Sequence, residues 1–315
     1  MARQPNRMIT FNDAIYMVNN EGFIEDANIP SSDVCMTRSD IENHFSNVDT
    51  SGFSSYNMNR LVPYDKIQTI PALFYESNGT VFYTGNTPGE TGHLNGDTNQ
   101  PIFTAVDNNM LSNMDPSSDD YTTIATTLVT DLDFIFSNTY NFNQDISTWD
   151  VSNVTTMVAL FNQATSFNQN INNWNVSNVT NMNGTFANAS SFNQPLDNWD
   201  LSNTTNIDYM FGNATSFNQP LNSWDVSNIT SMVGVFFDAS SFNQPLNNWD
   251  TSNLPQYSTN VGNTNMTDMF NGASNFNQDI SMWCVQNIPN KPPDFDSLTS
   301  ATWTTSEKPN WGVSC

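Results

Sequence analysis

The sequence predicts an α/β solenoid, a stack of 25-residue units in which each unit supplies a short parallel strand and a short helix. Two regularities predict this fold. Tryptophan recurs at positions 149, 174, 199, 224 and 249, and the phenylalanine of an FNQ motif recurs at 142, 167, 192, 217 and 242, so both advance in steps of 25. One such unit is too small to cover its own apolar face, so neighbouring units must stack to bury it.

One copy of the unit shows how it is expected to fold. Trp199 and Leu201 alternate with polar residues, which favours one face of a short strand. Ile207, Phe211 and Ala214 then follow at spacings of four and three, which favours about two turns of helix. Asn and Ser lie between these elements and predict turns, because their side chains hydrogen-bond the local backbone.

The repeat also sets the limits of the predicted domains. A degenerate unit with Leu132 and Phe136 at the apolar positions precedes the first full unit. The last FNQ phenylalanine, Phe276, stands 34 residues after Phe242, and because 34 − 25 = 9, nine residues are inserted, which the alignment of units places at Pro255–Asn263. The predicted domains are an N-terminal α+β domain at 1–106, a linker at 107–130, the solenoid at 131–288 and an irregular C-terminal cap at 289–315.

Three segments predict the small N-terminal α+β domain. Residues 10–20 are expected to form a helix, and a capping box at Thr37–Asp40 is expected to begin a second helix that runs through Phe45. Residues 71–84 contain two apolar runs around Ser-Asn-Gly, which is a hairpin signal. We expect this domain to serve attachment or homo-oligomerisation.

The charge balance argues against two classes of partner. The chain has 7 Lys+Arg against 31 Asp+Glu, a formal net charge of −24, and no Lys or Arg lies between Lys66 and Lys291. Because phosphate binding needs clustered cations, neither nucleic acid nor an anionic membrane is an expected partner. No segment approaches the roughly 18 apolar residues of a membrane span, and the N-terminus lacks the apolar segment of a secretory signal.

No catalytic site is predicted. The two histidines, His44 and His93, lie far apart in the sequence, and no Cys/His cluster has the spacing of a zinc site. No phosphate-binding loop is present either. We therefore expect a protein that is not an enzyme and needs no cofactor, with Ca²⁺ as the one ion to consider.

The case for Ca²⁺ rests on an aspartate that follows four of the repeated tryptophans: Asp150, Asp200, Asp225 and Asp250, with Asn175 in the remaining copy. Stacked strands would place these carboxylates about 5 Å apart. Bound Ca²⁺ would relieve their repulsion. In the alternative interpretation, each Asp accepts backbone N–H groups within its own turn, as Asn175 also could.

Two further ladders allow a similar choice. The asparagines of the FNQ motif recur at 143, 168, 193, 218, 243 and 277. They could present amides to sugar hydroxyls, or they could form an internal hydrogen-bonded spine. The repeated tryptophans could form an aromatic platform for glycans, but their place in the apolar alternation favours the core.

Residues that are invariant between copies are explained by stacking, so ligand specificity is expected where the copies differ. The variable triplet of one unit contains Asp208 and Tyr209, and the inserted loop at Pro255–Asn263 contains Tyr257 and Asn260. Loops on a rigid scaffold carry function disproportionately. We therefore predict the inserted loop, together with Asp208 and Tyr209, as the ligand contact.

Cys284 and Cys315 bracket the predicted cap. The last unit of a stack exposes an apolar face that must be covered, and a bridge between these cysteines would hold a Pro-rich, irregular segment over it. Two buried free thiols are the alternative, because synthesis in the cytoplasm argues against early oxidation.

The repeat sequence FNQPLNNWDTSN…MFNGASNFNQ resembles the BspA-type leucine-rich-repeat surface proteins of bacteria over about residues 131–288. This resemblance implies a leucine-rich-repeat-like stack and adhesion to host proteins or surfaces. The segment from WCVQNIPNKPPDF to NWGVSC is similar to the terminal cap of such arrays in Bacteroidetes. Unlike those proteins, this sequence shows no signal peptide and no sorting tail.

A different resemblance lies near the N-terminus. The segment DVCMTRSDIENHF…SSYNMNRLVPYDKI is similar to virion proteins of phages that infect Bacteroidetes. It implies a capsid-decorating or fibre-like virion protein, such as a head fibre, that is assembled in the bacterial cytoplasm and exposed after lysis. Its N-terminal domain would contact other virion proteins, and its solenoid would contact a cell-surface protein or glycan. The alternatives are a bacterial surface adhesin and a purely structural, particle-stabilising protein.

Overall fold

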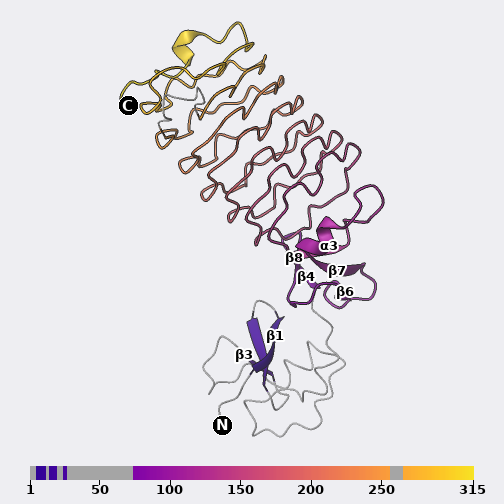
Figure 1. Ribbon diagram of the computed structural model, residues 1–315. Coiled ribbons are helices and arrows are strands. Elements are labelled where there is room, and N and C mark those ends of the chain that lie inside the picture. The colour runs from indigo at the N-terminus through magenta and orange to yellow at the C-terminus, as the bar shows by residue number, and fades with distance from the viewer. Residues whose placement is uncertain (1–4, 12–13, 20–23, 27–73, 256–264) are drawn as a thin grey trace, which may run out of the picture. The chain divides into compact units, whose positions relative to one another are not determined.

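In the computed structural model, the described residues are 5–11, 14–19, 24–26, 74–255 and 265–315 (Figure 1). The chain divides into two compact units, residues 1–76 with 82–104 and residues 77–81 with 105–315. Within the described ranges, no helix is long and apolar enough to cross a membrane.

The first sheet lies where the sequence predicted a helix at residues 10–20. Strands β1 (Pro5–Phe11), β2 (Ala14–Asn19) and β3 (Ile24–Asp26) form an antiparallel sheet in the order β1-β2-β3. The helix prediction is therefore wrong. The segment is rich in β-branched and aromatic residues, which suit a pleated sheet, and pairing with a second strand outweighs the local helical preference. The helix expected from Thr37 to Phe45 lies outside the described residues.

The predicted hairpin is confirmed. Strands β4 (Phe74–Ser77) and β5 (Thr80–Tyr83) are hydrogen-bonded neighbours in a two-stranded sheet. The two residues between them, Asn78 and Gly79, have φ angles of 51° and 81°. Positive φ at both central residues is what a two-residue type I′ turn requires, and Asn-Gly tolerates it best.

The segment 107–130 is not the linker that the sequence predicted. It contains the helix α3 (Asn108–Ser112) and the strand β8 (Ile124–Leu128), and β8 joins β6 (Thr91–His93) and β7 (Ile102–Asp107) in a sheet of order β6-β7-β8. Between α3 and β8, the buried ring of Tyr121 packs edge-on against Phe136 and Phe142. The segment thus packs on the repeat, because the first unit of a stack also has an apolar face to bury.

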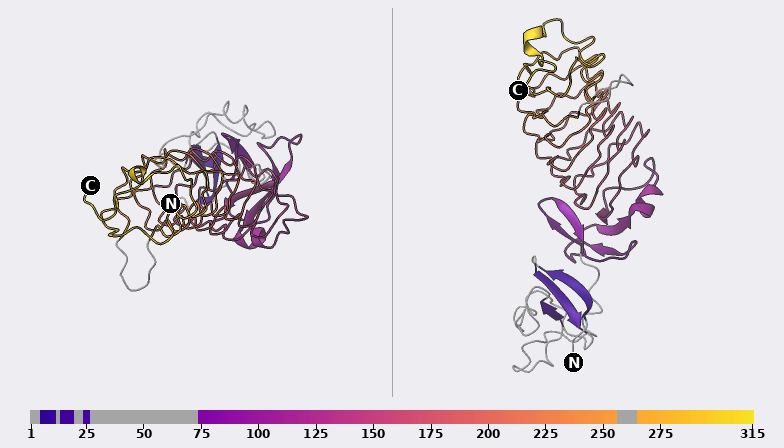
Figure 2. Two further views of the ribbon diagram at one scale, coloured as in Figure 1. Left: turned by 90° about the horizontal axis from the view of Figure 1, so that it is seen from above. Right: turned by 60° about the vertical axis from the view of Figure 1, so that its left-hand side comes forward.

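From residue 131 onward the chain winds as a stack of similar turns, which we call coils; the first coil is residues 131–155 (Figures 1 and 2). Alternate N–H groups of each coil donate to carbonyl oxygens of the next. In the second coil, for example, the N–H groups of Met157, Ala159 and Phe161 donate at N···O distances of 2.8 to 3.0 Å. The same set recurs one coil later from Met182 and Phe186. Backbone donors are therefore satisfied between coils.

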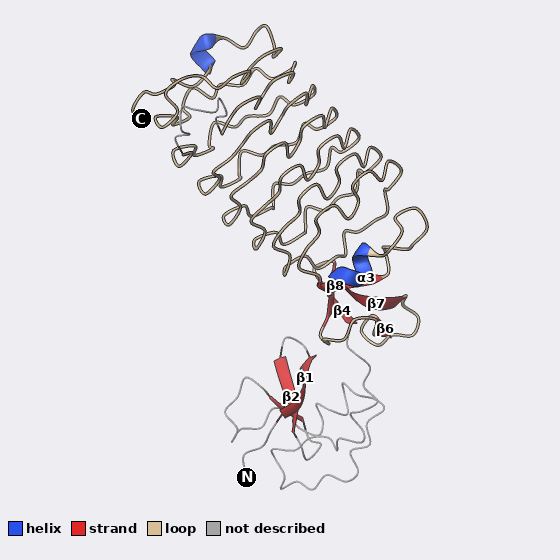
Figure 3. Ribbon diagram, viewed as in Figure 1, coloured by secondary structure: helices blue, strands red, loops and turns tan. Residues whose placement is uncertain are grey.

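This bonding replaces the short helix expected at about 205–214, where Figure 3 shows only turns. Tyr209 and Asn213 have φ angles of 52° and 57°. An α-helix cannot contain such left-handed residues, and it would use its own carbonyls for N–H groups that here bond the next coil. The parallel bridges also lie elsewhere than Trp199–Leu201, at Asp131, Thr156, Asn181, Asn206 and Ser231.

The core of the stack consists of aromatic ladders. Four pairs of successive repeat tryptophans stack at centroid separations of 5.9 to 6.5 Å with interplanar angles of 5 to 8°. Each indole N–H donates to a backbone carbonyl, as Trp199 does to Ile171 at 3.1 Å. The FNQ phenylalanines stack at 5.9 to 6.1 Å. The tryptophans are therefore core residues, and none of the six lies on the surface as a glycan platform.

The stack continues across the inserted residues. The N–H of Met232 donates to the carbonyl of Asn265, 33 residues ahead, whereas Met157 donates to Asn181, 24 residues ahead. The difference of 33 − 24 = 9 equals the insertion. Trp249 and Trp283 stack at 5.9 Å on either side of it. The insertion thus leaves the core register unchanged.

The C-terminal cap closes the last coil. Trp303 packs edge-on against Phe276 at 4.9 Å, and Cys284 and Cys315 form a disulfide with their Cα atoms 5.6 Å apart. The short 3-10 helix η1 (Thr305–Glu307) lies in this region. The Asp296 carboxylate pairs with Lys291 at 2.6 Å and Lys308 at 2.8 Å. Burial acts to raise the pKa of Asp296, but the two lysines outweigh it and hold the pKa below its ordinary value.

We predict that Trp199→Ala destabilises the protein by about 3–5 kcal/mol, because it removes a buried aromatic side chain and one of the two donors to the Ile171 carbonyl, the other being the N–H of Trp174. Chemical denaturation measures the loss. Hydrogen exchange should accelerate most in the adjoining coils, since each coil contacts only its neighbours. The control is Met282→Ala, whose side chain is 80% exposed and should change stability by less than about 0.5 kcal/mol. Equal effects of the two substitutions would contradict the core assignment.

Candidate functional site

The aspartates proposed as metal ligands are occupied in local turns. Oδ1 of Asp150, Asp200, Asp225 and Asp250 each accepts the backbone N–H of the serine two residues later, at 2.9 to 3.0 Å. Asn175 accepts the same bond from Ser177 at 3.2 Å. For Asp225, hydrogen bonds from the hydroxyl and N–H of Ser227 hold the pKa of the carboxyl below its usual value. These bonds are those expected if each Asp accepts backbone N–H groups within its own turn, a role that needs a side-chain oxygen and that Asn175 therefore also fills.

No group of three or more His, Cys, Asp or Glu side chains suited to a metal ion occurs among the residues that the structure describes.

The FNQ asparagines form the predicted hydrogen-bonded spine. Oδ1 of Asn143 accepts the N–H of Asn168 at 2.9 Å, and the same bond recurs from Asn193 to Asn168 at 2.9 Å. From the second motif onward, the neighbouring glutamine adds an amide bond to the same acceptor, as Gln169 does at 3.0 Å. The spine runs coil to coil as far as Asn277. Its oxygens therefore serve the stack and are not available to sugars.

The predicted ligand contacts divide into three cases. Oδ1 of Asp208 accepts bonds from Ser231 Oγ at 2.6 Å and Val233 N at 2.7 Å, so it ties one coil to the next. Tyr209 is 39% exposed and its ring lies over Gly234, where a Cβ atom would overlap it. Burial, followed by Asp268 and Asp208, raises the pKa of the Tyr209 hydroxyl. Tyr257 and Asn260 lie outside the described residues.

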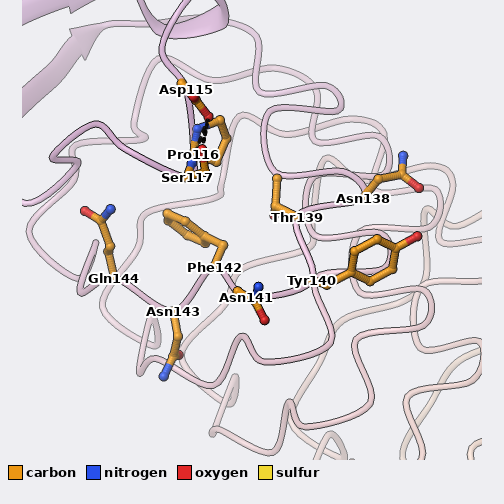
Figure 4. A pocket seen from close by; sticks show the side chains of 10 residues that line it. All are labelled: Asp115, Pro116, Ser117, Asn138, Thr139, Tyr140, Asn141, Phe142, Asn143 and Gln144. Atoms are coloured by element: carbon orange, nitrogen blue, oxygen red, sulfur yellow. Dashed lines mark hydrogen bonds between the residues drawn. The ribbon is translucent and has the colours of Figure 1, made fainter.

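The pocket that the sequence did not predict lies on the first coil. It has a volume of about 590 Å³, within the range typical of small-molecule sites. Two segments line it, as Figure 4 shows: Asp115, Pro116, Ser117, Asn138, Thr139, Tyr140, Asn141, Phe142, Asn143 and Gln144. We call this the first-coil groove.

Most polar groups of the groove are positioned by the fold. Gln144 accepts the N–H of Tyr121 and donates to the carbonyl of Asp119, both at 2.8 Å. Asp115 Oδ1 accepts from the hydroxyl and N–H of Ser117, and these bonds hold the pKa of Asp115 below its ordinary value. Tyr140 is 54% exposed, and its hydroxyl donates to Gln163 Oε1 at 3.1 Å.

One sequence signal could have revealed the groove. Tyr140 stands two residues before the FNQ phenylalanine, at a position where the full repeats carry only Thr or Ser: Thr165, Ser190, Thr215, Ser240 and Ser274. A large aromatic residue at a small-residue position is a departure that stacking does not explain. The segment 115–117 could not be placed opposite it from the sequence, because the composition of this segment predicts a linker.

We predict that Asp225→Asn lowers stability less than Asp225→Ala, which costs roughly 0.5–1 kcal/mol, because both substitutions remove the charge that the lowered pKa favours but only the second removes the acceptor for Ser227. Thermal unfolding with Ca²⁺ and with a chelator provides the test. The melting temperature of the unaltered protein should be the same in both. A rise with Ca²⁺ that Asp225→Asn abolishes would restore the metal interpretation.

No curated protein matches this chain, and no solved structure matches it. The family described as "Mycoplasma protein of unknown function, DUF285" matches residues 106–222 and 219–313, which together make up more than half of the chain. The matched range begins before the first coil, at the segment that packs on it, and ends within the cap. The chain therefore belongs to the DUF285 family.

Proposed function

We propose that this protein is a non-enzymatic attachment protein, in which a leucine-rich-repeat-like solenoid contacts a cell-surface protein or glycan. The proposal rests on a difference between the repeated and the variable positions of the stack. The repeated Trp, Phe, Asn and Asp side chains pack or hydrogen-bond within the stack, as Trp199, Asn168 and Asp200 do. Departures from the repeat, such as Tyr140 and Tyr209, leave aromatic rings exposed on this rigid framework. Exposed aromatic groups on a rigid scaffold are typical of binding surfaces.

Two finer assignments belong to the same proposal. The stack is of the BspA type, which is supported by the FNQ…W repeat sequence and by a family match over the same residues. The protein is a virion component, capsid-decorating or fibre-like, which is supported by the N-terminal resemblance to virion proteins of phages that infect Bacteroidetes. In this proposal the N-terminal region contacts other virion proteins, and no cofactor takes part.

We predict that fluorescently labelled full-length protein binds saturably to Bacteroidetes cells, and that excess unlabelled protein displaces it. Flow cytometry measures the binding, with heat-unfolded protein as the control. A variant lacking Pro255–Asn263 tests the inserted loop, because the deletion restores the 25-residue period and shortening a loop changes closure entropy little. Loss of binding in this variant would place the contact there. Absence of saturable binding to any strain would contradict the attachment function.

Immunogold electron microscopy decides the location. We expect label on purified phage particles. Label confined to cell envelopes would contradict the virion assignment and favour a bacterial surface adhesin, while leaving the attachment function in place.

A further inference from the structure

We infer that the first-coil groove binds an uncharged saccharide, with the Tyr140 ring as its stacking platform. This inference rests on the proposed attachment function and names a ligand class and a site for it. The groove is a cavity of about 590 Å³, and eight of its ten lining residues have polar side chains, which suits a hydroxyl-rich ligand. Its exposed surface is nevertheless mostly apolar, which suits the C–H faces of a sugar ring.

The charge of the region selects against acidic ligands. Asp115 lines the groove, and its lowered pKa keeps the carboxylate ionised at neutral pH. No Lys or Arg occurs between Lys66 and Lys291, so the first coil and the segment opposite it contain no such cation to pair with a phosphate, sulfate or carboxylate. A bound anion would face an uncompensated negative charge. The groove therefore selects against an anionic saccharide, whereas an uncharged one meets no such repulsion.

The groove also offers hydrogen-bonding groups that the fold leaves free. The Asn141 side chain makes no hydrogen bond to the described part of the chain. Asn143 uses its Oδ1 atom in the spine, which leaves both N–H groups of its amide as donors. The second carboxylate oxygen of Asp115 remains an acceptor, since Ser117 occupies Oδ1. Sugar hydroxyls both donate and accept, so they match this mixed set.

Tyr140 supplies the apolar contact. Its ring is 54% exposed, and the bond from its hydroxyl to Gln163 restricts the position of the ring. A pyranose presents one face of C–H groups, and these pack on the electron-rich face of an aromatic ring. The amides thus provide hydrogen bonds to sugar hydroxyls, and the exposed aromatic ring provides the packing surface for sugar C–H groups.

The test begins with an array of neutral and anionic oligosaccharides probed with the full-length protein, followed by calorimetric titration with the neutral oligosaccharide that gives the strongest signal. We expect Tyr140→Ala to weaken binding about tenfold or more, and Asn141→Ala to weaken it less. Tyr140→Phe retains the ring and should bind within about threefold of the unaltered protein. Met282→Ala, which removes another exposed side chain of the stack, is the control and should bind normally. Tyr209→Ala is measured alongside and tests the alternative that the exposed ring of Tyr209 forms the site.

The outcomes separate this inference from the proposed function. Failure of every neutral oligosaccharide to bind, while the protein still binds cells, overturns the saccharide assignment and leaves attachment intact. Loss of binding in Tyr209→Ala but not in Tyr140→Ala places the site elsewhere on the stack and also overturns it. Preferred binding of anionic oligosaccharides contradicts the charge argument. If neither cells nor oligosaccharides are bound, the proposed function fails as well.

Discussion

The hydrogen bonds between successive coils are the constraint on which the rest of the structure depends. Each coil donates alternate N–H groups to the carbonyls of the next, as Met182 and Phe186 do. Once this register is set, equivalent side chains must lie directly above one another. The tryptophan, phenylalanine and asparagine ladders are consequences of the register, and the nine-residue insertion is tolerated because the chain returns to the same register at Asn265. A buried backbone with no helix can persist only because its polar groups are satisfied in this way.

The stack contains no Lys or Arg, because neither residue occurs from 67 to 290. Charge pairs with these residues cannot hold its coils together, so amide side chains provide the lateral bonds. Asn168 is typical, accepting from Asn193 in the next coil. Lysine occurs again in the cap, after the repeat ends. Lys291 and Lys308 pair with the half-buried Asp296, and the Lys308 ammonium lies 4.6 Å from the centroid of the Trp303 ring. The cap is held by ion pairs, a disulfide and edge-on aromatic contacts, because its residues do not continue the repeat.

The first-coil groove lies at the opposite end of the stack, where the regular repeat begins. The segment that contains α3 and Tyr121 takes the place of a preceding coil: Tyr121 packs edge-on against Phe136 and Phe142, and its carbonyl accepts the indole N–H of Trp149 as each later coil does for the next tryptophan. That segment does not follow the repeat, and the space between it and residues 138–144 is the groove. Side chains here are free of the repeat pattern, which is why Tyr140 can replace a small hydroxyl residue. Binding groups thus gather where regular stacking begins.

Periodicity in the sequence was sufficient to determine the length of the unit, the core positions and the site of the insertion, because stacking repeats the same environment every 25 residues. It also pointed correctly to the asparagine spine and to local turns for aspartates such as Asp225. It could not determine the backbone within the unit. Spacings of three and four residues suit both a helix and a run of tight turns, and only bonding to neighbouring coils decides between them. The packing of residues 107–130 and the groove that they line were likewise decided by tertiary contacts, since residues such as Asp115 and Tyr140 belong to no common pattern in the chain.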